Sequence, residues 1–256
     1  MTRVAIVTGA AQGIGRAIAL QLARDGIDLA VNDIFSKRVD LEQLLNEIEQ
    51  LGRRTALILG DVSNETEVKS MVQKTVDVLG SLDITILVQM VANAGVPQYH
   101  TPLLNATDED FDRVMDINCK GTLYCYRAAA VQMIKQGRGG RITGASSMVG
   151  IHASRFSMAY CASKFAIRAI TQTAALEWGQ YNITVNAYAP GIIETSMISE
   201  ATGGASSEQL ADLFMSGACL KRPGQPEEVA ALVGFLASEN AAYITAATLH
   251  LLNWSK

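Results

Sequence analysis

Short apolar, β-branched runs alternate with amphipathic helical patterns along almost the whole chain. Strand-like runs lie at residues 4–8, 27–32, 55–59, 84–91, 141–145, 183–187 and 245–251, and helical periodicity fills most of the intervals. Strands that alternate with helices predict an α/β fold, with one parallel, doubly wound β-sheet and helices on both faces. The 256 residues contain no repeat or linker, so we expect a single domain over 1–256.

Polar residues and glycines stand at the carboxyl ends of the predicted strands. In an open parallel sheet, ligands bind in the crevice beyond these ends. The positions are Gly9–Gly15, Asp33, Asp61, Asn93, Ser147 and Pro190-Gly191. Their convergence on one edge of the sheet predicts a cofactor and reaction site there.

A glycine-rich turn, T-G-A-A-Q-G-I-G, separates the first strand from the first helix. Gly9, Gly13 and Gly15 would let the backbone approach a pyrophosphate, and the helix N-terminus would offer it unpaired N–H groups. The spacing is not the commoner G-x-G-x-x-G, and three glycines alone also suit a plain tight turn. The flanking strand and helix favour a dinucleotide site in a Rossmann-type fold.

Asp33 ends the second predicted strand, about 20 residues past the glycine turn. A carboxylate at this place can bond both hydroxyls of an adenosine ribose and would repel a 2′-phosphate. Gln12 and Ile34 offer no positive charge to such a phosphate, although Lys37 and Arg38 follow shortly. NAD(H) is therefore favoured over NADP(H); the alternative is that Asp33 merely ends a strand.

Tyr160 and Lys164 are four residues apart in a predicted helix and would project from the same face. A nearby ammonium favours the phenolate, which lowers the pKa of the phenol and brings proton transfer within reach at neutral pH. Ser147 lies thirteen residues earlier, where its hydroxyl could bond the oxygen that Tyr160 protonates. Without the cofactor motifs, the pair would read as a surface tyrosine and lysine.

Together these motifs resemble the short-chain dehydrogenase/reductase family over nearly the whole chain. N-A-G at 93–95 and P-G-x-x-x-T at 190–195 match two further family segments. The family's catalytic tetrad is matched by Asn118, Ser147, Tyr160 and Lys164. The resemblance implies that Tyr160 is the acid/base, that Lys164 also bonds the nicotinamide ribose, and that Asn118 positions a relay water. The implied cofactor-binding residues are Gly9, Gln12, Gly13, Ile14, Gly15, Asp33, Asp61, Val62, Asn93, Ala94, Gly95, Tyr160, Lys164, Pro190, Gly191, Ile193 and Thr195.

Within the family, the chain is most similar to the diacetyl (acetoin) reductase and 2,3-butanediol dehydrogenase branch. The similarity lies in the glycine motif, in Asp33, and in the stretches S-K-F-A-I-R-A-I-T-Q-T-A-A and I-T-V-N-A-Y-A-P-G-I-I-E-T. It implies NAD(H)-dependent interconversion of a secondary alcohol and a ketone, with a small hydroxyketone or diketone as substrate. Two alternatives stay open: a 3-oxoacyl-carrier-protein reductase, which would want NADPH and a basic docking patch, and a non-catalytic NAD-binding scaffold protein.

The chain departs from the family pattern at two places. Residues 85–89 read as about five extra residues before the N-A-G motif, and an odd insertion inverts the faces of a strand unless a bulge or loop absorbs it. The D-G-G that usually follows the last strand is missing, and the chain ends L-H-L-L-N-W-S-K. Neither departure touches the tetrad.

Two local features of the predicted helices bear on the site. Asn64 and Glu67 have the spacing of a capping box that opens a helix. A long helix is predicted over 108–135 with Thr107 as its cap. Asn118 lies in its middle, where asparagine is a mediocre helix former, so we expect a local distortion, a polar role or a solvent-facing side chain.

The substrate side of the chain is the least regular. Residues 192–221 form a long irregular segment with a helical piece expected near 210–214, which suits a lid over a substrate. Met148, His152 and Met197 are candidates for lining the substrate pocket. The family resemblance implies a homotetramer formed through the long helices and the C-terminal strand.

Composition narrows the partners. The net charge is −4 and no basic patch stands out, which argues against nucleic acid. The four cysteines form no C-x-x-C pair and are expected to be reduced thiols. The sequence shows no signal-like or membrane-spanning apolar run, so we expect a cytoplasmic protein that binds no membrane. The three histidines form no metal-like cluster, so no metal is expected.

Overall fold

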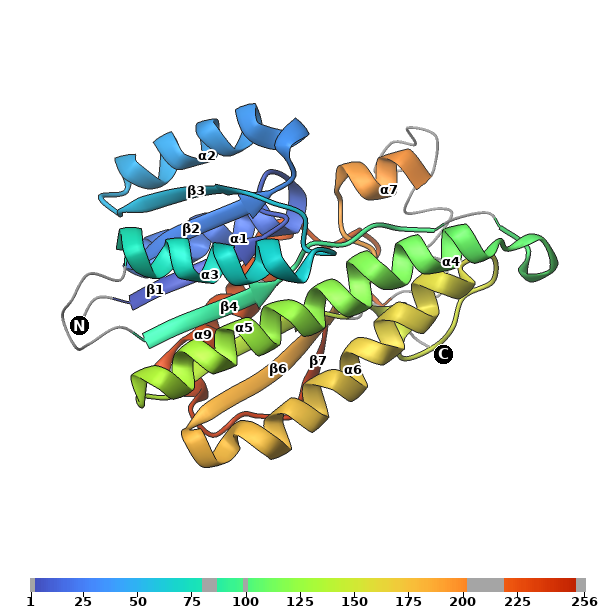
Figure 1. Ribbon diagram of the computed structural model, residues 1–256. Coiled ribbons are helices and arrows are strands. Elements are labelled where there is room, and N and C mark those ends of the chain that lie inside the picture. The colour runs from blue at the N-terminus through green and yellow to red at the C-terminus, as the bar shows by residue number, and fades with distance from the viewer. Residues whose placement is uncertain (1–2, 80–86, 99–100, 202–218, 252–256) are drawn as a thin grey trace.

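A seven-stranded parallel sheet forms the centre of the molecule (Figure 1). The computed structural model describes residues 3–79, 87–98, 101–201 and 219–251. The strand order is β3-β2-β1-β4-β5-β6-β7, so the order reverses between β1 and β4, where doubly wound sheets bind their ligands. The strands are β1 Arg3–Thr8, β2 Ile27–Asp33, β3 Thr55–Leu59, β4 Leu87–Ala92, β5 Gly140–Ala145, β6 Ile183–Pro190 and β7 Thr248–Leu251. The predicted fold class is confirmed.

Helices cover both faces of this sheet (Figure 1). One face carries α1 (Gly13–Arg24), α2 (Arg38–Gln50) and α9 (Pro226–Ala237), which bury one hydrophobic cluster against the strands. The other face carries α3 (Glu65–Leu79), α5 (Gly121–Gln136) and α6 (Met158–Trp178), which bury a second cluster. Because apolar residues stand on both faces of β1, β4 and β6, these strands read as nearly continuous apolar runs in the sequence.

The long helix predicted over 108–135 is broken in its middle. α4 (Asp108–Val114) begins at Thr107, whose hydroxyl accepts the N–H of Asp110 at 3.2 Å, as predicted. A π-helical stretch, Met115–Lys120, then separates α4 from α5. Asn118 lies in this stretch, and π-bulges of this kind are frequent at functional sites. Of the three expectations for Asn118, the structure confirms the distortion and the polar role, and the side chain is fully buried.

Strand β4 runs in regular parallel register with β1, from Arg3 opposite Leu87 to Val7 opposite Val91. The predicted extra residues therefore do not disturb the strand from Leu87 onward, although 85 and 86 lie outside the described residues. The start of the predicted strand at 84 lies outside them as well.

The last strand begins at Thr248 rather than at residue 245. Thr245 accepts the N–H of Val185 on its side-chain oxygen at 3.1 Å, and Ala246 has a positive φ of 61°, which interrupts the extended backbone. Asn186 holds the same turn, because its amide donates to Ile244 O at 2.8 Å and accepts from Ala247 N at 3.2 Å. The missing D-G-G and the helical piece predicted near 210–214 lie outside the described residues.

Candidate active site

The glycine turn follows β1 and is shaped by close backbone contact. A Cβ atom on Gly15 would lie 2.1 Å from Gly9 O and 2.5 Å from Asn93 Nδ2, so no side chain fits there. The first turn of α1 contains no acidic residue, and Gln12 at its N-cap makes no side-chain capping bond. The unpaired N–H groups of this helix start are thus open to an anion, as a bound pyrophosphate requires.

The N-A-G segment holds the glycine turn in place. The hydroxyl oxygen of Thr8 accepts the backbone N–H groups of Asn93 and Ala94, both at 3.1 Å. The Asn93 amide donates to Thr8 O at 3.0 Å and to Gly9 O at 3.2 Å, and its oxygen accepts the hydroxyl of Tyr188 at 2.8 Å. Asn93 therefore shapes the turn through its side chain.

Asp33 stands at the end of β2 beside the same turn. Its carboxylate accepts the N–H of Ala11 at 3.1 Å and of Ile34 at 2.9 Å, which fixes both oxygens. Lys37 folds back in a short 3₁₀ turn and donates to Gln12 Oε1 at 2.8 Å. In the sequence, Lys37 follows the glycine turn at some distance. In the structure, its ammonium contacts the turn.

The end of β3 carries Asp61 and Val62. Asp61 accepts the N–H and the O–H of Ser63 on one oxygen, both at 2.8 Å, and Val62 is buried. Asn64 caps α3 as predicted, since its oxygen accepts from Thr66 N at 3.0 Å. The predicted capping box is wrong in one half: Glu67 accepts the N–H of Asp61 at 2.8 Å instead of that of Asn64.

The segment after β6 approaches the glycine turn from the opposite side. A Cβ atom on Gly13 would lie 3.4 Å from Thr195 Cγ2, so Thr195 and the turn are neighbours. Ile193 is buried and forms a parallel bridge with Gly224. Pro190 ends β6, and Gly191 donates to Leu251 O at 3.0 Å.

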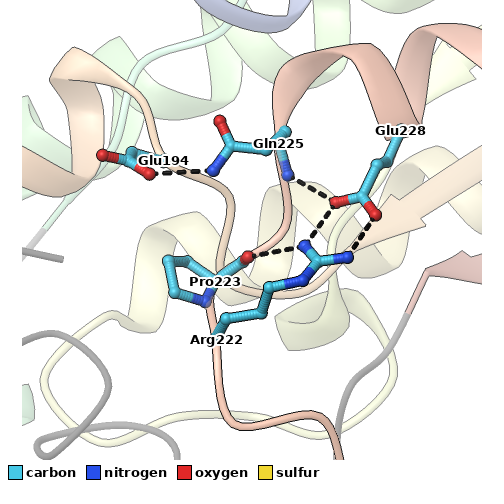
Figure 2. Close-up of polar contacts among 5 residues, drawn as sticks. All are labelled: Glu194, Arg222, Pro223, Gln225 and Glu228. Atoms are coloured by element: carbon cyan, nitrogen blue, oxygen red, sulfur yellow. Dashed lines mark hydrogen bonds and ion pairs between the residues drawn. The ribbon is translucent and has the colours of Figure 1, made fainter. Parts of the chain in front are cut away.

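A polar network joins the start of the predicted lid segment, 192–221, to the residues that follow its end (Figure 2). Gln225 Nε2 donates to Glu194 Oε2 at 2.8 Å. The guanidinium of Arg222 donates to both oxygens of Glu228 at 2.8 and 2.6 Å, and Glu228 also accepts the N–H of Gln225 at 2.7 Å. The hydrogen bond from Arg222 lowers the pKa of Glu228 to about 2. Between these ends, α7 (Ser196–Ala201) contains Met197.

Lys164 lies in the interior beside Tyr160. Its Nζ donates to Ala145 O at 2.8 Å and stands 5.4 Å from the centre of the Tyr160 ring. The lysine is 4% exposed, and burial lowers its pKa from 10.5 to about 8. Tyr160 itself is partly exposed, so its ring faces the charge on one side and remains accessible.

Two serines at the end of β5 have different tasks. Ser146 is buried: its hydroxyl donates to Lys164 O at 2.9 Å and its N–H donates to Tyr188 O at 2.8 Å. Ser147 follows as the cap of a short 3₁₀ turn and accepts from Val149 N at 3.4 Å. Ser146 thus anchors the end of β5 to α6, and Ser147 follows as the first residue beyond this anchor.

Asn118 is tied to the neighbouring segments by its whole amide. Its oxygen accepts Val96 N–H at 2.8 Å, and its nitrogen donates to Val96 O at 2.9 Å and to Ser163 Oγ at 3.1 Å. A Cβ atom on Gly95 would lie 3.1 Å from Asn118 Oδ1 and 3.4 Å from Lys164 Nζ. The structure therefore gathers Asn118, Gly95 and Lys164, and both amide hydrogens of Asn118 are donated to protein oxygens.

The three candidate pocket residues follow the ends of two strands of the site. Met148 starts the 3₁₀ turn after Ser147, and the exposed His152 donates its backbone N–H to Met148 O at 3.0 Å. Met197 lies in α7, beyond the end of β6.

Metal and disulfide chemistry find no support at this site. In the part of the chain that the structure describes, no group of histidine, cysteine and acidic residues could hold a metal ion. All four cysteines are free. No described helix is long and apolar enough to cross a membrane.

Gln98 is a residue of the site that sequence reasoning missed. Its Oε1 accepts Ala159 N–H at 2.8 Å, one residue before Tyr160. No motif marks it, although its place three residues after the N-A-G segment could have drawn attention.

The sheet carries the glycine turn at its switch point, and Lys164 approaches Gly95 of the N-A-G segment that holds this turn. This arrangement is typical of dinucleotide-dependent oxidoreductases. A family model described as enoyl-(acyl carrier protein) reductase matches residues 9–251. A short-chain dehydrogenase/reductase of Armillaria gallica is 47% identical over 97% of this chain and 94% of its own length. The chain belongs to the short-chain dehydrogenase/reductase family, whose members bind a nicotinamide cofactor.

Other similar proteins carry more specific names. The 3-oxoacyl-[acyl-carrier-protein] reductase of Staphylococcus aureus is 39% identical over 98% of this chain and 97% of its own length. L-2,3-butanediol dehydrogenase of Corynebacterium glutamicum is 36% identical over 96% and 95%. The crystal structure of acetoin dehydrogenase from Salmonella typhimurium superimposes with a TM-score of 0.85 at 31% identity, covering 98% of this chain and 94% of that chain.

Proposed function

We propose that the protein interconverts a secondary alcohol and a ketone by hydride transfer, with NAD(H) rather than NADP(H) and with a small hydroxyketone or diketone as substrate. The observation that carries this proposal is the buried Lys164 ammonium, 5.4 Å from the Tyr160 ring, next to a glycine turn whose helix start is open to an anion. A proton donor and a cofactor site then adjoin one another.

The residues around the turn fit a nicotinamide dinucleotide. The space that a Cβ atom on Gly15 would fill is closed by backbone, and the α1 N-terminus is suited to a pyrophosphate. Asp33 would bond the adenosine ribose, Asp61 and Val62 would border the adenine, and Ile193 and Thr195 would border the nicotinamide. When bound, the nicotinamide supplies or accepts the hydride.

The protein's own groups handle the proton. In the reducing direction, the Tyr160 hydroxyl donates its proton to the substrate oxygen, and the Ser147 hydroxyl donates a hydrogen bond to the same oxygen. The Lys164 ammonium stabilises the phenolate that Tyr160 becomes. Because burial sets the pKa of Lys164 to about 8, this ammonium is present at neutral pH and is lost as the pH rises past that value.

The preference for NAD(H) rests on Asp33. Two backbone N–H groups hold its carboxylate in place. In that position it would bond ribose hydroxyls and would repel a 2′-phosphate. Lys37 stands against this preference, since its ammonium also reaches the turn; it is engaged by Gln12 at 2.8 Å and lies 3.8 Å from Asp40.

The substrate class rests on similarity to acetoin dehydrogenase and L-2,3-butanediol dehydrogenase. A second candidate, reduction of a 3-oxoacyl group on a carrier protein, is supported by the 39% identical Staphylococcus aureus reductase. The acidic net charge of −4 counts against docking an acidic carrier. The close approach of Asn118, Tyr160 and Lys164 counts against a non-catalytic scaffold.

We also propose that the protein is a homotetramer. Helices α5 and α6 expose large apolar side chains, which a second copy of the chain would cover. They are Val131, Ile134, Phe165 and Leu176. Light scattering is expected to give four times the chain mass of 27.4 kDa, and a monomeric mass would contradict the proposal.

The direct test is NADH oxidation against a panel of acetoin, diacetyl, larger ketones and an acetoacetyl thioester, repeated with NADPH. We expect turnover of the small ketones with NADH. Turnover of the thioester with NADPH alone would favour the second candidate, and no ketone-dependent oxidation with either cofactor would refute both.

A further inference from the structure

We propose that Gln98 is a positioning residue, which caps the catalytic helix α6 from a distant part of the chain and thereby orients Tyr160. This inference rests on the proposed function, because it assigns a role in the reaction that Tyr160 performs. Gln98 stands 61 residues before Ala159, whose N–H it accepts at 2.8 Å.

Helix α6 lacks a cap of its own. Ser157 occupies the N-cap position but makes no side-chain bond to the helix; its hydroxyl donates to Arg155 O at 3.5 Å instead. Ala159 is fully buried, so water cannot replace Gln98 as the acceptor for its N–H. The start of the helix therefore depends on this one side chain, which is itself 7% exposed.

The segment that contains Gln98 also touches the other half of the site. Val96 is bonded through both its N–H and its carbonyl to the Asn118 amide. Farther along, Thr101 donates its N–H to Phe156 O at 3.1 Å, just before α6 begins. One stretch of chain thus fixes the π-helical turn and the first turn of α6 relative to each other.

The Gln98 amide caps the helix at a cost to stability. Its Nε2 is buried and has no hydrogen-bond partner among the residues that the structure describes. A buried donor without a partner is destabilising, and a cap of lower cost was available from the hydroxyl of Ser157. Such costs are often found at functional sites. Because Gln89 also has an unpaired half-amide, the kinetic comparison of the two glutamines decides whether Gln98 has a role in catalysis.

The consequence for Tyr160 follows from helix geometry. Met158 is the first helical residue and Tyr160 the third, so Tyr160 lies in the turn that Gln98 caps. Lys164 lies one turn farther on and is held separately through Ala145 O. Loss of the cap should let Tyr160 move relative to Lys164 and Ser147, and small misplacements of reacting groups are costly.

The test compares Gln98→Met with Gln98→Glu and with Gln89→Met. Methionine keeps the volume and removes the acceptor, whereas glutamate restores an oxygen for the Ala159 N–H. Gln89 is a matched control: it is 1% exposed, its Nε2 donates to Ala237 O at 2.8 Å at the end of α9, and its Oε1 also has no partner in the described part of the chain. The readouts are kcat and KM for ketone and NADH, and hydrogen exchange of the peptide that begins α6.

We expect Gln98→Met to lower kcat about tenfold or more, with KM for NADH within about twofold and faster exchange at the start of α6. Gln98→Glu should restore slow exchange and most of kcat, and its charge near Tyr160 should shift the pH profile of alcohol oxidation upward. Gln89→Met should keep wild-type kcat.

Wild-type kcat in Gln98→Met, an equal loss in Gln89→Met, or unchanged exchange at α6 would overturn the role. If none of the ketones in the panel supports NADH oxidation by the wild-type protein, the proposed function fails. The hydrogen-exchange measurement still decides whether Gln98 caps the helix.

Discussion

The proposed cofactor side (the glycine turn and Asp33) and the proposed catalytic side (Asn118, Ser147, Tyr160 and Lys164) are held in place by different means. At the glycine turn, contacts with the backbone fix the structure: Gly15 packs against Gly9 O, and two backbone N–H groups hold the Asp33 carboxylate. At the catalytic side, buried side chains bond to partners far away in sequence, as Asn118 does to Val96 and Gln98 to Ala159.

Because of this difference, the two sides should be sensitive to different kinds of substitution. Close packing of backbone responds to added volume, so the cofactor side should fail when a methyl group is inserted. Sites held by buried polar groups are sensitive to the loss of a hydrogen-bond partner and to changes in protonation. The low dielectric of the interior makes each hydrogen bond stronger and makes an unpaired polar group more costly. The two sides should therefore lose function separately, one through affinity for the cofactor and the other through the rate of the chemical step.

Among the variants that compare the two sides, the largest effect is expected from Lys164→Met. Turnover should fall about 100-fold or more, because Tyr160 loses the charge that stabilises its phenolate. At neutral pH, burying the charged lysine costs the folded wild type about 3 kcal/mol, given its shift from 10.5 to a pKa of about 8. Between these pH values the unfolded chain binds more protons, so the free energy of unfolding of the wild type should rise with pH relative to the variant.

Urea unfolding of both proteins at pH 7 and pH 10 checks the linkage. Groups that titrate in both proteins cancel in the difference. If the free energies of unfolding of the two proteins change equally between pH 7 and pH 10, Lys164 keeps its proton in the folded protein. That result would contradict the lowering of the Lys164 pKa by burial.

Gly15→Ala tests the cofactor side. A Cβ atom 2.1 Å from Gly9 O forces the turn to open. We expect a cost of about 1–3 kcal/mol, seen as weaker NADH binding in a fluorescence titration, with kcat at saturating NADH nearly retained. Gly179→Ala is the matched control, since a Cβ atom there has no neighbour within 4 Å. Normal NADH affinity in Gly15→Ala would remove the turn from the binding site.

Asp33→Ala should give a smaller change, a shift of about tenfold in relative kcat/KM from NADH toward NADPH. The carboxylate that repels a 2′-phosphate is then gone, while Lys37 remains at the turn. Lys37→Met, made in the same background, should reverse part of the gain with NADPH. Full NADH preference in Asp33→Ala would sink the argument from the carboxylate.

The smallest effect is expected at the exposed ion pair of Figure 2. Arg222→Met removes two short hydrogen bonds to Glu228, but both side chains are exposed, so water replaces them. We expect the melting temperature to stay within about 2 °C and kcat to stay near the wild-type value. A large loss of turnover would mean that the exposed Arg222–Glu228 ion pair is as important for catalysis as the buried Lys164.

The sequence predicted the cofactor side more completely than the catalytic side. Strand ends, glycines and Asp33 can be predicted from the local sequence pattern, because each depends mainly on residues that are close to it in the sequence. The exception is Lys37, whose approach to Gln12 depends on a short 3₁₀ turn that no motif marks.

On the proposed catalytic side, the sequence singled out candidate residues but not the contacts that support them. The thirteen-residue spacing to Tyr160 points to Ser147, but no spacing predicts the bond from the neighbouring Ser146 to Lys164 O, which joins positions 18 residues apart. An asparagine in a helical pattern indicated only a possible distortion at Asn118, and the sequence did not predict that it is π-helical. Bonds of this kind depend on tertiary packing, which periodicity does not encode.

The most direct measurement is a paired one on Tyr160→Phe: NADH affinity by fluorescence titration and the single-turnover rate of ketone reduction. The phenylalanine keeps the ring beside Lys164 and removes the proton donor. We predict unchanged NADH affinity, within about twofold, and a rate at least about 1,000-fold lower. A variant that transfers hydride at the wild-type rate would show that Tyr160 is not the acid, and would contradict the account.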